Sequence, residues 1–164
     1  MKILVQQQKA LNMLDIAAKF VSKNSTLPIL QNIYLKASID SLLIRATDME
    51  KYVEIEIPCE VQIEGAITIN AKTFLDILKT IESENIELSV DQKTNIMTIK
   101  TPKDTFDING IAASEYVALP EVPQENSFIL DTLAFSKGID HVEYAVTEKS
   151  FSPVLTGVLM KTGK

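Results

Sequence analysis

The residue types that usually carry enzyme chemistry are few in this sequence and lie far apart. His141 is the only histidine and Cys59 the only cysteine, too little material for a histidine-based triad, a histidine metal cluster or an internal disulfide. Cys59 follows Pro58 at a predicted strand end with no histidine near it in the sequence, which favours a buried structural thiol over a nucleophile. We expect His141 to be a surface or packing residue.

Asp48, Glu50, Glu54 and Glu56 are close enough in sequence to suggest a hard-metal site. Residues 52–58 alternate between apolar and polar types, however, so a strand would place Glu54 and Glu56 on its exposed face as solvated carboxylates. The five glycines are scattered and form no glycine-rich phosphate loop. We therefore expect no metal, no cofactor and no catalytic site. A hydrolase using Asp48 or Cys59 is the least favoured alternative.

The composition is that of an ordinary soluble globular protein, with 46% apolar and 23% charged residues. No run reaches the eighteen or so apolar residues that span a bilayer, so no membrane association is expected. A single cysteine and the lack of a secretory signal at the N-terminus predict the cytoplasm. The net charge of −6 excludes a surface coated by nucleic acid but allows one basic face on an acidic body.

Lysines recur on one side of two predicted helices. When the helix predicted at 8–21 is drawn as a wheel and continued to residue 23, Lys9, Asn12, Lys19 and Lys23 fall within about 80° of one another. In residues 71–82, Lys72 and Lys79 share a face with Asp76 beside them. These faces fit contact with DNA phosphates. They equally fit solvated helix surfaces with local ion pairs such as Lys72–Asp76.

The elements that carry these helices repeat. Sliding the sequence by 64 positions places Val5 on Ile69 and Leu11 on Leu75, and each copy reads as a strand followed by an amphipathic helix. Three strands follow each helix. They are predicted at 30–37, 41–47 and 52–58 in the first copy, after a first strand at 2–6. In the second copy they are predicted at 85–91, 96–101 and 105–111, after a first strand at 66–70.

A longer repeat places "STLPILQNIYLK" (25–36) on "SFSPVLTGVLMK" (150–161). Sliding by 125 positions superposes Pro28 on Pro153 and Asp15 on Asp140. The sequence thus predicts a first domain at 1–119, a proline-bearing linker at 120–126, and a third copy of the unit at 127–164 that contains only a strand, a helix and a second strand. Such a piece is too small for its own core. We expect the chain to be part of a longer protein, or this piece to be covered by another copy.

Several of these segments resemble the bacterial DNA sliding clamps, the beta subunits of DNA polymerase III. The resemblance is carried in order by "TLPILQNIYLKA", "LIRATDMEKYVEIEI", "AKTFLDILKTI" and "FSPVLTGVLM". It implies an α+β clamp fold of tandem β-α-β-β-β units, with helices on the DNA-facing side and antiparallel sheets outside. The chain would hold the first clamp domain and the truncated start of the second.

The function that the resemblance implies is mechanical: a homodimeric ring encircles double-stranded DNA, without sequence preference, and tethers DNA polymerase III after a clamp loader has placed it there. An interaction module on a clamp-like fold that never touches DNA is the alternative from another class. Matching the family residue by residue implies DNA contacts at Lys23, Asn24, Lys72, Lys79 and Lys149. Asn24 stands where the family has an arginine. Pro153 and Val154 stand where some members have aromatic DNA contacts, which puts the DNA role of that loop in doubt.

Two further surfaces are implied by the resemblance. Leu155 matches one wall of the cleft that receives partner peptides, most of which would lie outside this sequence. "TFDING" (105–110) matches the edge strand of the ring interface, with Phe106 and Ile108 as apolar contacts and Lys103 as the basic one. The same residues also fit an ordinary alternating edge strand.

Overall fold

The computed structural model describes residues 1–22, 25–118, 129–147 and 151–161. The chain divides into two compact units, Met1–Leu119 and Pro120–Lys164, which we call unit 1 and unit 2. Each unit is considered by itself below. No helix in the described residues is long and apolar enough to cross a membrane.

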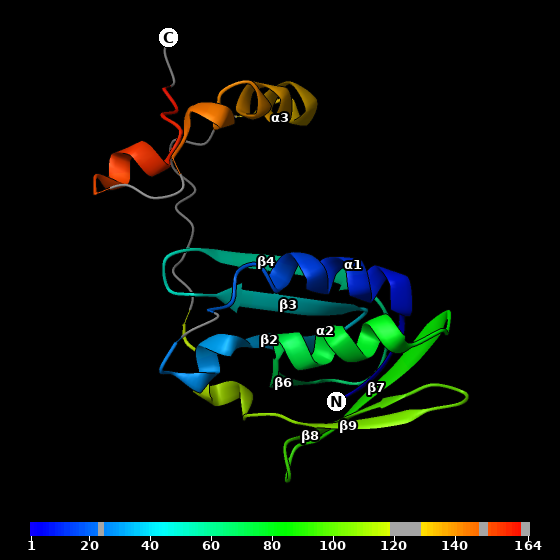
Figure 1. The fold of residues 1–164 in the computed structure, drawn as a ribbon. Helices are drawn as coiled ribbons and strands as arrows, with labels where there is room; N and C mark the ends of the chain where they lie inside the picture. The colour runs from blue at the N-terminus through cyan, green and yellow to red at the C-terminus, as the bar shows by residue number, and fades with distance from the viewer. Residues whose placement is uncertain (23–24, 119–128, 148–150, 162–164) are drawn as a thin grey trace. The chain divides into compact units, whose positions relative to one another are not determined.

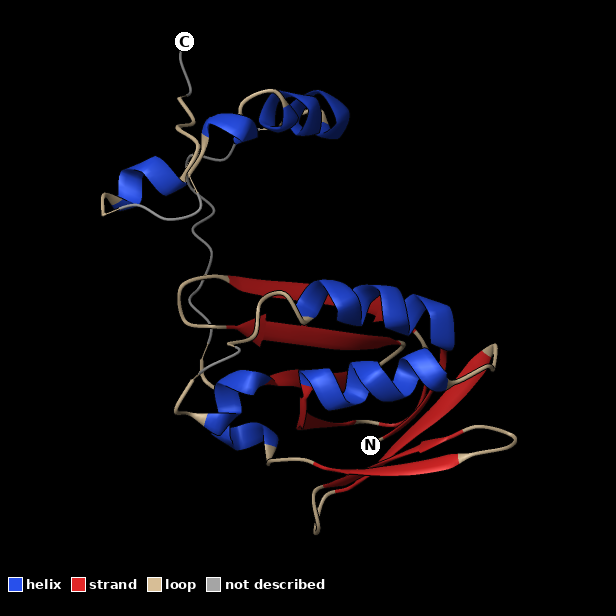
Figure 2. Cartoon of the chain, in the orientation of Figure 1, coloured by secondary structure: helices blue, strands red, loops and turns tan. Residues whose placement is uncertain are grey.

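Unit 1 contains two antiparallel sheets with two helices on one side of them (Figures 1 and 2). The four-stranded sheet has the order β4-β3-β2-β6 and the five-stranded sheet the order β5-β1-β7-β8-β9. The strands are β1 (Lys2–Gln6), β2 (Asn32–Ser38), β3 (Ser41–Thr47), β4 (Tyr52–Pro58), β5 (Glu60–Ile63), β6 (Gly65–Asn70), β7 (Asn85–Asp91), β8 (Ile96–Lys100) and β9 (Thr105–Asn109). The α+β architecture predicted from the sequence is confirmed.

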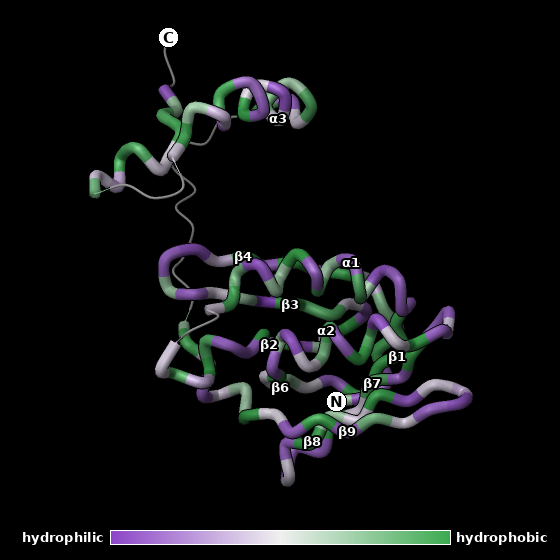
Figure 3. The backbone as a smooth tube through the Cα atoms, in the orientation of Figure 1, coloured by the Kyte–Doolittle hydropathy of each residue, from purple (hydrophilic) through white to green (hydrophobic). Residues whose placement is uncertain are grey.

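The helices are α1 (Gln7–Ala17) and α2 (Ala71–Thr80), and each follows a strand without a loop. Both are amphipathic, and Figure 3 shows hydrophilic and hydrophobic residues alternating along them. The buried stripe contains Ala10 and Leu14 in α1 and Phe74 and Leu78 in α2. These side chains join the inward residues of both sheets in one core, because each sheet needs a cover for its apolar face.

The 64-residue repeat appears in unit 1 as an exchange of first strands. β1 pairs with β7 of the second copy, and β6 pairs with β2 of the first copy. The registers correspond, since Val5 lies opposite Ile86 and its equivalent Ile69 lies opposite Ile33. Neither copy can complete its sheet without the other, so the two copies form a single folding unit.

Several local details differ from the sequence prediction. α2 ends at Thr80 rather than at 82, and β9 ends at Asn109 rather than at 111. α1 ends at Ala17 rather than at 21, because the chain tightens into i→i+3 hydrogen bonds from Lys19 to Ile16 and from Phe20 to Ala17. The strand predicted from residue 30 begins only at Asn32, after a 3₁₀ turn at Pro28–Gln31. β5 was not predicted, although its residues alternate between polar and apolar types; in the structure its pairing with β1 has a bulge between Lys2 and Ile3.

The described residues of unit 2 contain one α-helix, α3 (Thr132–Asp140), and two 3₁₀ turns, η3 (Glu143–Ala145) and η4 (Pro153–Thr156). The second strand predicted here is absent from residues 151–161, and none of the described residues of this unit is buried. A strand requires a neighbour for its backbone hydrogen bonds, and the described part of unit 2 provides none.

Unit 2 nevertheless repeats the local structure of unit 1 at the predicted spacing of 125 residues. The 3₁₀ turn at Pro28–Gln31 returns at Pro153–Thr156. The hydrogen bond from Ser22 N to Leu30 O (2.9 Å) returns from Thr147 N to Leu155 O (3.2 Å). The helix–loop–turn part of the repeat is therefore formed by local contacts, without a sheet in the described residues of unit 2.

Candidate nucleic-acid interface

The two helices of unit 1 lie antiparallel, and a buried glutamine joins them. Gln7, at the start of α1, is 7% exposed, and its Nε2 donates a hydrogen bond to the carbonyl of Leu78 near the end of α2 (2.7 Å). Its backbone N–H donates to Glu84 O (2.9 Å). A buried amide that is satisfied by the neighbouring helix fixes the spacing of the two helices. The role of Gln7 was not predicted from the sequence. The one feature that could have indicated it is that Gln7, a polar residue, aligns with the apolar Ala71 in the 64-residue repeat.

α2 begins at a well-formed cap. The side chain of Asn70 accepts a hydrogen bond from Thr73 N (3.0 Å), which satisfies one of the free N–H groups of the first turn. Lys72 and Lys79 then project from the exposed side of α2, and Lys9 and Asn12 from the exposed side of α1. Because the two helices adjoin, the structure brings these predicted residues to one side of unit 1.

The ion pairs on this side are few. Lys19 lies 3.5 Å from Asp15, both largely exposed, so this pair contributes little to stability. The Lys72–Asp76 pair considered from the sequence is not formed. Within the described residues, Lys9, Lys72 and Lys79 have no carboxylate oxygen within 4.0 Å. Their ammonium groups are available to an external anion.

The helix side is weakly positive in an acidic chain. Residues 7–20 and 71–80 carry four lysines against Asp15 and Asp76, a balance of +2, whereas the whole chain has −6. A hollow of 490 Å³ lies between the end of α1 and the start of α2, with Ala18, Ser22, Asn70 and Lys72 in its wall. Sparse, mobile cations without directional partners suit attraction to a phosphate backbone rather than readout of bases.

Three of the predicted DNA contacts, Lys23, Asn24 and Lys149, lie outside the described residues. Their place relative to Lys72 and Lys79 therefore stays a prediction.

The predicted ring-interface strand, β9, is an edge strand of its sheet, since it pairs only with β8. Lys103 is exposed in the turn before it, and Phe106 is half-buried against the core. Ile108 is 5% exposed and belongs to the core, so its side chain is largely covered within this chain, and its contact with a partner stays a prediction. Side chains two residues apart in a strand point to the same face, so Phe106 and Ile108 both point toward the core. Phe106 is nearer the beginning of the strand and remains partly accessible.

In unit 2, the predicted cleft residue Leu155 lies in η4 and is 57% exposed. A shallow hollow nearby is lined by Val146, Thr147, Thr156 and Val158. Leu155 is not among its lining residues, so the described residues do not form a cleft around it.

The residues considered for chemistry are held in structural roles. Cys59 is half-buried against the core, and burial raises the pKa of its thiol, which disfavours the reactive thiolate. Glu54 pairs with Arg45 (2.5 Å). Asp48 hydrogen-bonds Lys51 and the backbone of its own turn. Among the described residues no group of acidic, histidine and cysteine side chains could hold a metal ion.

Comparisons with known proteins agree with this geometry. Residues 1–120 match the family model of the DNA polymerase III beta subunit, N-terminal domain. The beta sliding clamp of Bacillus subtilis is 30% identical over 169 residues, covering 98% of this chain and 44% of that protein. The chain therefore spans less than half the length of this relative.

Solved structures show the same fold. A DNA polymerase sliding clamp from Bacillus subtilis superposes with a TM-score of 0.88 at 27% identity, over 96% of this chain and 43% of that one. A Helicobacter pylori beta clamp bound to a DNA ligase peptide superposes with a TM-score of 0.84 at 24% identity, over 93% of this chain and 42% of that one.

Proposed function

This chain belongs to the family of the DNA polymerase III beta subunit, a non-catalytic processivity subunit, and from this premise we propose that it forms part of a ring that encircles duplex DNA. Residues 1–119 would be the first clamp domain and residues 127–164 the beginning of the second. The ring would be a homodimer in the cytoplasm that tethers the replicative polymerase after a clamp loader has placed it on DNA.

The helix side of unit 1 is the observation that carries this proposal. It combines two antiparallel helices, lysines without carboxylate partners among the described residues, and a positive balance within an acidic chain. A clamp that surrounds its DNA is retained by topology, so it needs only modest and sequence-independent attraction to phosphates. Lys72 and Lys79 of α2 are the described residues that we assign to this contact.

The ring would close through the β9 edge. Its unpaired backbone groups can accept a further strand, with Phe106 and Lys103 as the side chains beside that contact. Ile108 would support the interface by shaping the strand from within the core. Leu155 would join the peptide cleft once the remainder of the second domain surrounds it. The Helicobacter pylori beta clamp solved with a DNA ligase peptide shows that a protein of this fold binds such a peptide.

The proposal is tested with Lys72→Glu in the full-length protein, measured as retention on nicked circular DNA over a range of salt concentrations. Lys93→Glu is the matched control, because Lys93 is also exposed but lies in the β7–β8 turn rather than on a helix. We expect Lys72→Glu to weaken retention and to reduce the salt dependence by about one counterion per lost phosphate contact.

The control should behave as the wild type. If both variants keep wild-type retention and salt dependence, Lys72 is not a DNA contact. If the wild type itself shows no salt-dependent retention, the chain is an interaction module on a clamp fold.

A further inference from the structure

Two exposed isoleucines lie on neighbouring turns of unit 1. Ile39, in the β2–β3 turn, is 83% exposed, and Ile63, at the end of β5, is 58% exposed. The β2–β6 register ends with Ala37 opposite Gly65, and each isoleucine is two residues away from this pair. The bond from Ile39 N to Glu64 Oε1 (3.0 Å) ties the two turns together. We call Ile39 and Ile63 the isoleucine patch.

Each isoleucine is turned outward by an irregularity of the backbone. Regular alternation along β5 would send Ile63 inward after Val61, but the bulge opposite Lys2 and Ile3 shifts it to the outer side beside Lys2. Ile39 has φ 56°, a left-handed conformation that is unfavourable for a β-branched residue. The packing of the core does not require the side chain of Ile39 or Ile63 to be exposed.

The patch has an acidic frame, Asp40, Glu60 and Glu64, all exposed. Asp40 lies in the turn of Ile39, and its carbonyl accepts a hydrogen bond from Cys59 N (2.9 Å), which brings the β4–β5 junction to the same place. Residues 37–44 and 53–71 contain no lysine, arginine or histidine. The neighbouring Lys2 is engaged by Glu87 at 3.1 Å. Asp40, Glu60 and Glu64 are thus the charged residues closest to the patch in sequence, and the exposed Lys36 lies three residues before Ile39.

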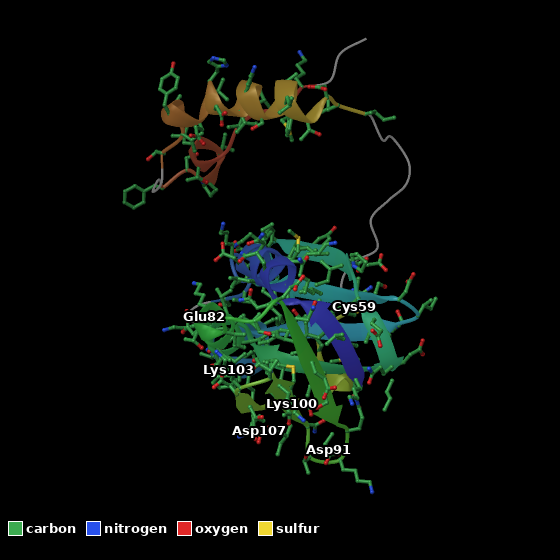
Figure 4. The ribbon with its side chains drawn as sticks, turned by 90° about the vertical axis from the view of Figure 1, so that its right-hand side faces the viewer. Cys59, Glu82, Asp91, Lys100, Lys103 and Asp107 are labelled. Atoms are coloured by element: carbon green, nitrogen blue, oxygen red, sulfur yellow. The ribbon has the colours of Figure 1, made fainter. Side chains whose placement is uncertain are left out.

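The β4–β5 junction, next to the patch, lies apart from the end of α2. In Figure 4, Glu82, just after α2, and Cys59, at the β4–β5 junction beside the patch, lie on opposite sides of unit 1. A partner bound there would leave the helix side free, so the site does not depend on the DNA contact proposed above.

We propose that the isoleucine patch and its acidic frame form a docking site for a short segment of another protein, with one or two apolar side chains flanked by lysine or arginine. The apolar side chain covers the two isoleucines, and the basic residues meet the frame. A second copy of the chain is disfavoured as the partner. Two-fold symmetry would bring the two acidic frames together, and their negative charges would repel each other. Nucleic acid is repelled by the same carboxylates. The small area makes the contact weak and transient.

The test is a selection of displayed random peptides against this chain, followed by fluorescence anisotropy of the enriched peptides. Ile63→Ser and Glu60→Lys probe the patch and the frame. Leu27→Ser is the control, because Leu27 is 57% exposed, as Ile63 is, but lies before the 3₁₀ turn at Pro28–Gln31. Thermal unfolding of each variant verifies that it is folded.

We expect enriched peptides with an apolar residue between basic ones and a loss of about tenfold in affinity for Ile63→Ser. Glu60→Lys should weaken binding most at low salt, and Leu27→Ser should leave it unchanged. Failure to enrich such peptides, or equal binding by Ile63→Ser and Leu27→Ser, overturns the proposal. Concentration-dependent dimerisation of the wild type that Ile63→Ser abolishes also overturns it, in favour of self-association.

Discussion

Gly110 is the residue at which a single methyl group should most disturb the joining of the two sheets. It follows β9 and precedes Ile111, which exchanges two backbone hydrogen bonds with Thr68 of β6, at 3.0 and 2.9 Å. A Cβ added at Gly110 would lie 2.7 Å from Thr68 O, 2.7 Å from Ile67 Cδ1 and 2.8 Å from Ile69 Cδ1. The carbonyl cannot retreat without stretching the bridge between the sheets.

The magnitude follows from two contributions. Overpacking of a fitted core costs about 1–3 kcal/mol, and weakening the Thr68–Ile111 bridge adds about 1 kcal/mol. We expect Gly110→Ala to lower the free energy of unfolding by about 3 kcal/mol and the Tm by roughly 10 °C. Urea and thermal unfolding followed by circular dichroism measure both. Gly138→Ala is the control, since a Cβ at Gly138 meets nothing within 4 Å.

A double-mutant cycle separates this mechanism from a general loss of stability. Ile67→Val removes the Cδ1 atom that the new methyl group would strike, at a cost of about 1 kcal/mol when made alone. In the Gly110→Ala background, the same change should cost less or stabilise. Strict additivity of the two changes, or a Gly110→Ala protein within about 0.5 kcal/mol of the wild type, would refute the steric argument.

Two further predictions concern pH. Burial raises the pKa of Tyr116 to about 12, and its hydroxyl donates to Asn32 O and Arg45 O, each at 3.4 Å. The neutral phenol is therefore favoured by folding, and this stabilisation is complete below about pH 10 and lost as the pH rises toward 12. Tyr116→Phe should cost about 1 kcal/mol at neutral pH, and the difference from wild type should shrink in alkaline urea titrations; a constant difference contradicts it. Hydrogen bonds from the side chain and backbone of Lys51 lower the pKa of Asp48 to about 2. That stabilisation is present above about pH 4 and lost as the pH falls toward 2, so Asp48→Asn should cost about 1 kcal/mol at pH 7 after solvent screening and nothing near pH 2. Parallel acid-unfolding curves for Asp48→Asn and wild type would disprove this.

The strands and helices of unit 1 could be predicted because their periodicity is local. Alternation in "VEIEI" and the apolar stripe of Phe74 and Leu78 report which residues face a core, whichever strand comes to lie beside them. The start of α2 at Ala71 was also predictable, because Asn70 is a preferred capping residue.

β5 escaped prediction although its local signal, the alternation of Glu60, Val61, Gln62 and Ile63, is present in the sequence. The role of Gln7, in contrast, depends on a distant neighbour. Gln7 becomes a positioning residue only when Leu78 is brought within reach of its amide. Pairing across 60 or more residues leaves no trace in local composition.

The two repeats have different physical consequences. At a spacing of 64 residues the copies exchange first strands, so each copy completes the sheet of the other. At a spacing of 125 residues the copy in unit 2 keeps its helix, its 3₁₀ turn and the hydrogen bond from Thr147 to Leu155, yet forms no strand in its described residues. Helices and turns satisfy their own backbone groups, whereas a strand needs a partner. The repeated unit therefore specifies its local structure by itself and its sheet only in pairs, which is why a clamp domain is built from two such units.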